Sequence, residues 1–154
     1  MKKHFKLAVS IASIAILSVI GFSFKDQVES IQKIDYYADA KNSNKLLEII
    51  KAELLKKRKP VVYFYATWCG PCKQFKNSLT DPLMIDALNG TTLIMIDADI
   101  DATKEKIGDK YHVSAYPAYL RLNEKGELLK KTDGGAWDEN IPKNMAPVLK
   151  GFLK

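Results

Sequence analysis

The stretch Val61–Cys72, VVYFYATWCGPC, decides the fold, because an apolar run rich in β-branched and aromatic residues leads directly into a cysteine pair. Cys69 and Cys72 are the only cysteines among 154 residues. The run predicts a buried strand, which places Cys69 at the first turn of a helix, where unpaired N–H groups and the helix dipole stabilise a thiolate. Cys72 lies one helical turn further on, close enough to close a small disulfide ring. We expect Gly70 to form the tight turn and Pro71 to stiffen the first helical turn.

Three kinds of chemistry are compatible with this pair. A thiolate is the nucleophile of disulfide exchange, so a redox pair is the favoured interpretation. A purely structural disulfide is one alternative, although such a bond rarely joins cysteines this close together at a helix start. Zinc is the other, but it needs four ligands, and His4 and His112 are the only histidines. We therefore expect no metal site and no cofactor besides the Cys69–Cys72 disulfide.

Over Lys59–Gly126 the sequence resembles the thioredoxin superfamily, in which WCGPC is the active-site string of thioredoxins themselves. A second element, VSAYPA at Val113–Ala118, places Pro117 45 residues after Cys72. In the family, a cis proline at this point packs beside the cysteines, and the backbone before it pairs with substrate. The resemblance implies a cis Tyr116–Pro117 bond and a substrate-binding role for both residues. An ordinary strand-initiating proline is the alternative.

The resemblance further implies an α/β thioredoxin fold over residues 43–154, with a mixed central sheet and helices on both faces. Apolar runs, caps and turn residues agree with this architecture. Strands are expected at 61–65, 92–96, 118–122 and 127–131. Helices are expected from 43 or 44 to before Pro60, at 69–79, from Pro82 (capped by Asp81) to 89, at 103–111, and at 144–152 with Pro147 in the first turn.

The resemblance also implies a reaction cycle. Cys69 attacks a substrate disulfide, and Cys72 then attacks Cys69 and releases the reduced substrate. The predicted substrate-binding residues are Trp68, Gly70, Pro71, Tyr116 and Pro117; for Trp68, mere packing is the alternative. The Gly-Pro dipeptide favours a reductase of protein disulfides. An oxidase or isomerase that donates its disulfide is the first alternative, and a non-catalytic binding module is the second.

The sequence departs from thioredoxins proper at three positions. A buried aspartate six residues before the first cysteine handles the proton of the second cysteine in that family, and Tyr63 stands there. Met95 is the best match for the lysine that pairs with that aspartate. A neutral tyrosine cannot act as a carboxylate base, so Cys72 is expected to lose its proton to water, to Cys69 or to another group. Asn77 replaces the helix-kinking proline, and the helix instead breaks and restarts.

This break makes the segment from Cys72 to Leu88 similar to the C-terminal thioredoxin-like domain of membrane thiol:disulfide interchange reductases. The string YATWCGPC is also similar to membrane-tethered thioredoxins of cytochrome c maturation. Asp97, Asp99 and Asp101 are interpreted as a strand end and a helix-capping loop, because the glycine and distal glutamate of a calcium loop are missing.

Residues 1–23 have the features of a signal peptide: lysines 2, 3 and 6, an uncharged apolar run over 7–20, and small residues at Gly21 and Ser23. An uncleaved membrane anchor over 7–24 is the alternative. Either reading predicts export, to the periplasm or the outer face of the cytoplasmic membrane. Residues 24–42 are expected to form a linker or a short added helix.

The remaining charge and motifs limit the partners. Removing residues 1–23 lowers the formal charge from +6 to +3, which is no argument for nucleic acid. The basic run Lys56–Lys59 is interpreted as a solvated helix end. We find no nicotinamide or flavin motif, so a membrane electron-donating reductase is the implied partner, alongside substrate proteins with disulfides.

Overall fold

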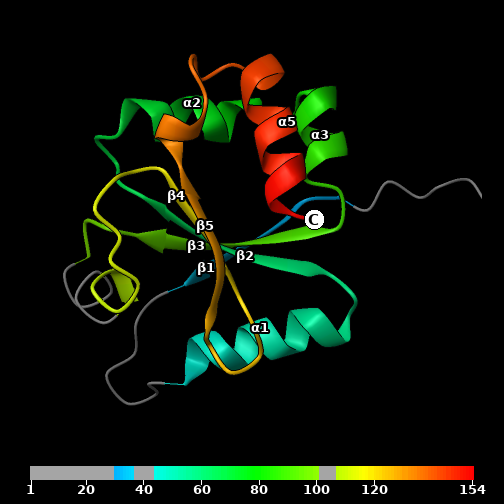
Figure 1. Cartoon of the computed structure of the whole chain (residues 1–154), viewed down its shortest axis with the longest axis vertical. Coiled ribbons are helices and arrows are strands. Elements are labelled where there is room, and N and C mark those ends of the chain that lie inside the picture. Colours follow the sequence, from blue (N-terminus) through cyan, green and yellow to red (C-terminus); the bar gives the residue numbers. More distant parts are fainter. Residues whose placement is uncertain (1–29, 37–43, 101–106) are drawn as a thin grey trace, which may run out of the picture.

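The structure is a computed structural model that describes residues 30–36, 44–100 and 107–154. Within these residues, five strands form one mixed sheet in the order β1-β3-β2-β4-β5 (Figure 1). Strands β1, β3 and β2 are parallel, β4 is antiparallel to β2, and β5 is antiparallel to β4. The strands are β1 Gln32–Tyr36, β2 Lys59–Tyr65, β3 Thr91–Asp97, β4 Ala118–Leu122 and β5 Leu128–Asp133.

Helices cover both faces of this sheet, as expected: α1 lies on one face, and α2, α3 and α5 lie on the other (Figure 1). Alternate residues of the central strands point to opposite faces. Tyr63 and Met95 therefore join the core under α2, α3 and α5, whereas Phe64 and Ile96 join the core under α1. The helices are α1 Lys45–Leu55, α2 Gly70–Ser78, α3 Pro82–Ala87 and α5 Pro142–Phe152, with a short 3₁₀ turn, η2, at Gly134–Ala136.

The predicted break after the active-site helix is confirmed. Helix α2 ends at Ser78, and α3 restarts with Pro82 in its first turn. The Asp81 carboxylate accepts a hydrogen bond from the Leu83 N–H at 2.9 Å, which satisfies one of the free donors of the first turn. The chain thus turns through a capped junction instead of continuing as one kinked helix.

Strand β1 corrects the prediction of a linker or added helix over 24–42. Residues 32–36 pair in parallel with β3, so the sheet begins before residue 43. The strand is at the edge of the sheet and exposes Gln32, Lys33 and Asp35, while Tyr36 is buried. Because β3 supplies the hydrogen-bonding partner, β1 needs no apolar run of its own, and the sequence gives little signal for it.

The prediction of a solvated helix end for the basic run Lys56–Lys59 is wrong at one position: its three lysines are exposed, but Arg58 is buried and only 8% exposed. Its guanidinium donates to the Thr92 hydroxyl at 2.8 Å and to the carbonyls of Thr91 and Ser30, each at 2.7 Å. The buried Glu53 carboxylate lies 3.7 Å away. Arg58 therefore links the end of α1 to the start of β3 and to Ser30. A side chain in solvent would make no such link.

The last helix begins at Pro142, two residues before the predicted start, so Pro147 lies inside the helix and not in its first turn. Proline lacks the N–H that a helix interior requires. Here its side chain is exposed, and the helix buries Met145, Ala146, Leu149 and Phe152 against the sheet. Burial of this apolar stripe outweighs the lost hydrogen bond.

Two predicted segments lie wholly or partly outside the described residues. The helix expected at 103–111 is described from Ile107, where Tyr111 N–H donates to the Ile107 carbonyl at 3.2 Å, and Val113 N–H to the Gly108 carbonyl at 2.9 Å. The apolar run over 7–24 lies outside them entirely. Across residues 30–36, 44–100 and 107–154, no helix is long and apolar enough to span a bilayer.

Candidate active site

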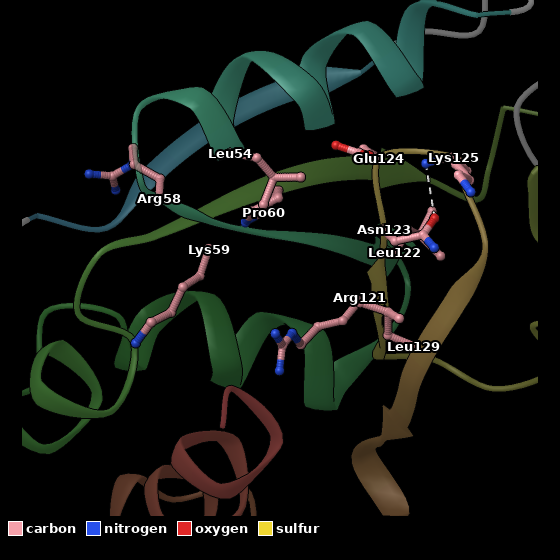
Figure 2. A pocket seen from close by; sticks show the side chains of 10 residues that line it. All are labelled: Leu54, Arg58, Lys59, Pro60, Arg121, Leu122, Asn123, Glu124, Lys125 and Leu129. Carbon is pink, nitrogen blue, oxygen red and sulfur yellow. Dashed lines mark hydrogen bonds between the residues drawn. The ribbon is translucent and has the colours of Figure 1, made fainter.

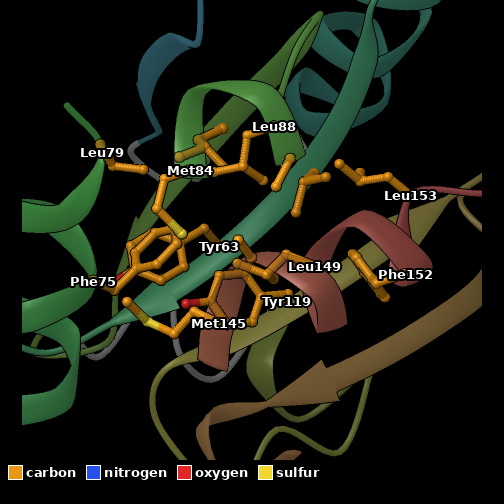
Figure 3. Packing of buried hydrophobic residues seen from close by; sticks show 14 of the residues in the cluster. Tyr63, Phe75, Leu79, Met84, Leu88, Tyr119, Met145, Leu149, Phe152 and Leu153 are labelled. Atoms are coloured by element: carbon orange, nitrogen blue, oxygen red, sulfur yellow. The ribbon is translucent and has the colours of Figure 1, made fainter. Parts of the chain in front are cut away.

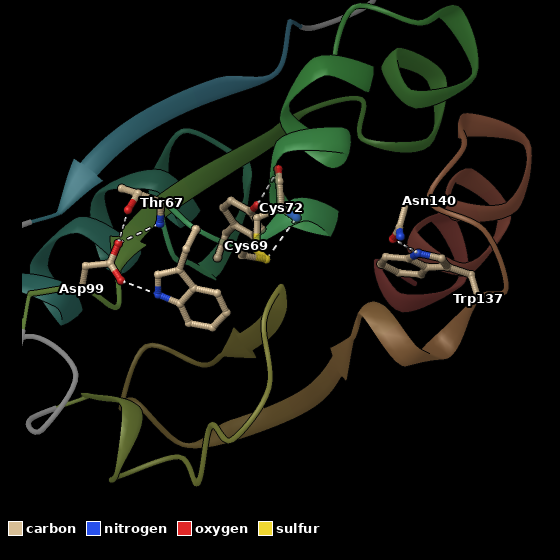
Figure 4. The surroundings of a disulfide bond; sticks show 8 residues. Thr67, Cys69, Cys72, Asp99, Trp137 and Asn140 are labelled. Atoms are coloured by element: carbon tan, nitrogen blue, oxygen red, sulfur yellow. Dashed lines mark hydrogen bonds between the residues drawn. A yellow bond between two sulfur atoms is a disulfide. The ribbon is translucent and has the colours of Figure 1, made fainter.

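The two cysteines lie where β2 leads into α2 and are joined by a disulfide with a Cα–Cα distance of 5.3 Å (Figure 4). Cys69 is the N-cap of α2, and its sulfur accepts a hydrogen bond from the Cys72 N–H at 3.1 Å. Cys69 is 3% exposed and Cys72 is fully buried. An N–H donor and the positive end of a helix dipole both favour negative charge on the Cys69 sulfur.

Two aromatic residues flank this pair, as predicted. Trp68 is 70% exposed, and its ring meets the half-buried Tyr116 ring edge-on at 6.1 Å between centroids. Tyr116 also packs against the cluster that contains both cysteines. The Tyr116–Pro117 bond is cis, which confirms the prediction. Pro117 is buried immediately before β4, whose first residue pairs with Phe64 near the end of β2.

Gly70 and Pro71 are exposed beside the disulfide, but only one of their predicted local roles is confirmed. Pro71 lies in the first turn of α2. Gly70 does not adopt the left-handed conformation that favours glycine, and a Cβ there would meet nothing within 4 Å. The prediction that the turn needs glycine is therefore wrong, because the extended Cys69 passes directly into the helix.

Asp99 is a site residue that the sequence interpretation missed. Its carboxylate accepts hydrogen bonds from the Thr67 hydroxyl at 2.6 Å, the Thr67 N–H at 2.7 Å and the Trp68 indole N–H at 2.9 Å. These bonds, those from Thr67 first, lower the pKa of Asp99. The available signal was topological: parallel β2 and β3 end at the same edge of the sheet, which brings an acid after β3 beside the donors after β2.

We predict that Asp99→Ala frees the Trp68 indole and lowers turnover of a protein disulfide several-fold without abolishing it. The indole N–H of Trp68 should then exchange with water faster in a ¹⁵N–¹H spectrum. In the native chain, the lowered pKa of Asp99 means that its hydrogen bonds to Thr67 and Trp68 persist at neutral pH. They are lost only when the carboxylate is protonated, at a pH below an ordinary carboxyl pKa of about 4. Asp81→Ala, which removes a distant helix cap, is the control. An unchanged Trp68 signal in Asp99→Ala would contradict this role.

Tyr63 occupies the core directly beneath the cysteines. It is fully buried, and its hydroxyl donates to the Cys72 carbonyl at 3.4 Å. Its ring packs against Phe75 at 4.9 Å and Tyr119 at 5.2 Å between centroids (Figure 3). Burial raises the pKa of Tyr63 far above its ordinary range. The phenol therefore stays protonated at neutral pH and offers no base to the Cys72 thiol.

Two further residues extend the site. The Lys76 ammonium, one helical turn after Cys72, lies 3.1 Å from the centroid of the Tyr65 ring, and that ring packs against the cysteine cluster. Burial lowers the pKa of Lys76, while the charges of Asp97 and Asp35 act against this change. Gly134 covers Pro117 closely: its N–H donates to the Pro117 carbonyl at 3.0 Å, and a Cβ would meet the proline Cδ at 2.9 Å.

The arrangement is suited to thiol–disulfide exchange at the start of α2, where exposed Gly70 and Pro71 lie beside the two sulfurs. The sulfur at the helix start has a polar environment that stabilises a thiolate, and the second sulfur is shielded behind it. Among the residues that the structure describes, no group of three or more His, Cys, Asp or Glu side chains could hold a metal ion.

Comparisons with known proteins agree with this geometry. Residues 41–147 match the thioredoxin family. The chain is 30% identical over 109 residues to the mitochondrial thioredoxin-3 of Saccharomyces cerevisiae, a match that covers 70% of this chain and 81% of that protein. It is 27% identical over 90 residues to thioredoxin-1 of Drosophila melanogaster, covering 58% and 78% of the two chains.

A solved structure shows the same fold. The chain resembles the disulphide isomerase of Xylella fastidiosa Temecula1 with a TM-score of 0.55, over 77% of this chain and 92% of that one, at 19% identity. At this identity the likeness concerns the fold alone. The family match, the sheet order and the cysteine pair at the start of α2 lead to one conclusion: this chain belongs to the thioredoxin family and is a thiol:disulfide oxidoreductase whose redox group is the Cys69–Cys72 pair.

Proposed function

We propose that the protein reduces disulfides of substrate proteins outside the cytoplasm, with Cys69 as the attacking and Cys72 as the resolving thiol. The observation that carries the assignment of roles is the hydrogen bond from the Cys72 N–H to the Cys69 sulfur, combined with complete burial of Cys72. A substrate reaches the sulfur at the helix start before it can reach the one behind it.

The cycle transfers two electrons. The Cys69 thiolate attacks one sulfur of the substrate disulfide, forms a mixed disulfide and releases the other substrate sulfur as a thiolate. Cys72, once deprotonated, attacks the Cys69 sulfur, forms the Cys69–Cys72 disulfide and releases the second substrate sulfur. Trp68 and Tyr116 present the exposed surface on which the substrate docks, and the backbone before Pro117 pairs with the substrate chain.

The direction of exchange is proposed from the Gly70–Pro71 dipeptide, which thioredoxins carry between their cysteines. The Cys69–Cys72 dithiol is oxidised when it reduces a substrate and must then be reduced again. An electron-donating reductase in the membrane would supply these electrons. The separation of α2 from α3 supports the similarity to the C-terminal domain of membrane thiol:disulfide interchange reductases.

A measured reduction potential tests the direction. We expect a value near the −270 mV of thioredoxin, well below the roughly −120 mV of a strong periplasmic oxidant. Equilibration of the Cys69–Cys72 disulfide with dithiothreitol buffers, followed by alkylation and mass spectrometry, gives this number. A potential close to the oxidising limit would show that the protein donates its disulfide instead.

The location is proposed from residues 1–23, with their lysine-led start and apolar run. Fusion of residues 1–40 to a reporter that is active only after export should give an active reporter. The matched control carries Ile14→Lys and Leu17→Asp, which interrupt the apolar run. A silent parent fusion would refute export, and the size of the mature product would decide between cleavage and an anchor.

A further inference from the structure

The side of the molecule away from the cysteines carries basic and apolar side chains together. Its cationic residues are Lys57, Lys59, Arg121, Lys125, Lys150 and Lys154, which we call the basic end. Two hollows, of about 470 and 280 Å³, share Lys59, and all of these residues except Lys57 line one or the other. Lys57 is exposed on the turn between α1 and β2.

The acids at this end offset only part of the positive charge. Asp86 pairs with Lys150 at 2.7 Å, and buried Glu53 pairs with Lys56 at 2.7 Å. Glu127 accepts a hydrogen bond from the Asn123 amide at 2.6 Å, and Glu124 is exposed. The basic end thus retains an excess of positive charge, carried by side chains that reach solvent.

Exposed leucines lie among these cations. Leu55 is 86% exposed, Leu129 is 55% exposed and Leu54 is 40% exposed. Leu54 and Leu129 line the larger hollow, and Figure 2 shows Leu54 beneath α1, with Lys59 and Arg121 extending on the other side of the hollow. Lysine or arginine beside exposed leucine is the composition of surfaces that lie in the headgroup region of an anionic membrane.

The entry of the chain into the fold lies at the same end. Ser30 is fixed there, because its carbonyl accepts the hydrogen bond from the Arg58 guanidinium. Five residues, 25–29, separate Ser30 from Phe24, the last residue of the possible anchor, and this connection can span at most about 20 Å. If residues 7–24 are held in a bilayer, this short connection keeps Ser30, and with it the basic end, within about 20 Å of the membrane surface.

We infer that the basic end, with Leu54, Leu55 and Leu129, docks on an anionic phospholipid surface. The inference rests on the export proposed above, with residues 7–24 retained as the membrane anchor, and it specifies the orientation of the domain there. The seven residues of β2 run from Lys59 to the active-site end, which places the cysteines about 20 Å further from the surface. In this orientation Trp68 and the disulfide face the aqueous phase, where a substrate protein can reach them.

Acetylation of lysines in the full chain tests this orientation. The protein is reconstituted into phosphatidylcholine vesicles with or without phosphatidylglycerol, labelled briefly with an acetylating reagent and read by mass spectrometry. We expect labelling of Lys57, Lys59 and Lys125 to fall about fivefold on the anionic vesicles, since each cation near an anionic surface gains roughly that factor in binding. Lys110, exposed before β4, and Lys143, exposed in the first turn of α5, line neither hollow, so their labelling should not change. A salt concentration of 1 M should remove the difference at the basic end.

Two variants and their matched controls sharpen the test. Lys59→Glu with Lys125→Glu should abolish the protection at Lys57, whereas Lys110→Glu with Lys143→Glu, which changes the net charge equally, should preserve it. Leu55→Ser should weaken the protection, and Leu83→Ser, at a leucine 52% exposed on α3, should not.

Equal labelling on the two kinds of vesicle would overturn the inference, even if the export reporter is active. If soluble heparin protects the same lysines as well as the vesicles do, and Leu55→Ser has no effect, the surface is a general polyanion site and the lipid proposal is wrong. A silent export reporter would instead refute the proposed location, independently of any difference in labelling.

Discussion

Cys69→Ser is expected to abolish reduction of a protein disulfide, because it removes the only thiolate that a substrate can reach. Cys72→Ser should also stop multiple turnover, but it should leave the first attack intact. Stopped-flow mixing with an oxidised substrate separates the two: attack is absent in Cys69→Ser and present in Cys72→Ser. In the reduced native chain, iodoacetamide near pH 7 should label Cys69 first, since Cys72 is fully buried.

Trp68→Ala is a useful control for this pair, because it weakens docking and leaves both sulfurs in place. It should lower the rate of attack without preventing it. Preferential alkylation of Cys72, or full attack by Cys69→Ser, would reverse the assignment of roles.

Tyr63→Asp is expected to cost about 3–5 kcal/mol of stability, because it removes a fully buried aromatic ring and introduces a carboxyl group there. Tyr63→Phe, which loses only the long hydrogen bond to the Cys72 carbonyl, should cost about 0.5–1 kcal/mol. Urea unfolding of the reduced proteins measures both values. A loss of less than about 1 kcal/mol in Tyr63→Asp would contradict the packing described here.

The same substitution should change the pH dependence of substrate release. Because burial raises the pKa of Tyr63 far above neutrality, the native site has no base there between pH 6 and 9. Release should therefore rise about tenfold per pH unit while Cys72 remains a thiol. Attack by Cys69 should level off at lower pH, since its thiolate is stabilised. Tyr63→Asp should speed release at pH 7 and flatten its slope, whereas Tyr63→Phe should not.

A native release rate that is already fast and flat over this range would mean that another group accepts the Cys72 proton. Lys76 would then be the residue to replace, because its ammonium is held against the Tyr65 ring beside the cysteine cluster and burial lowers its pKa. Lys76→Met should restore the steep slope in that case.

The central fold followed from the sequence because its signals are local. The apolar runs of β2 and β3 are buried on both faces, and Asp81-Pro82 marks a helix start by its own chemistry. Strand β1 could not be predicted in the same way, since its exposed polar residues are held by pairing with β3. Arg58 likewise looks in the sequence like its three basic neighbours. Its burial depends on hydrogen bonds to Ser30, Thr91 and Thr92, which only the folded structure brings close to it.

The same distinction between local and long-range signals applies to the residues of the active site. The cysteines, Trp68 and the cis Tyr116–Pro117 bond were predicted from motifs, because each belongs to a short string of consecutive residues, WCGPC or VSAYPA. Asp99 and Gly134 were not, since each acts on a residue more than fifteen positions away through the sheet topology. Gly70 shows the opposite error: the motif suggested a conformational need that the backbone does not have.

Isolation of the mixed disulfide tests the account most directly. Cys72→Ser should accumulate complexes with its substrates when expressed in the cell of origin, and alkylation under acid quench followed by mass spectrometry should locate every cross-link at Cys69. Cys69→Ser treated in parallel should give none. Complexes that are linked through Cys72, or equal yields from both variants, would contradict the claim that Cys69 attacks and Cys72 resolves.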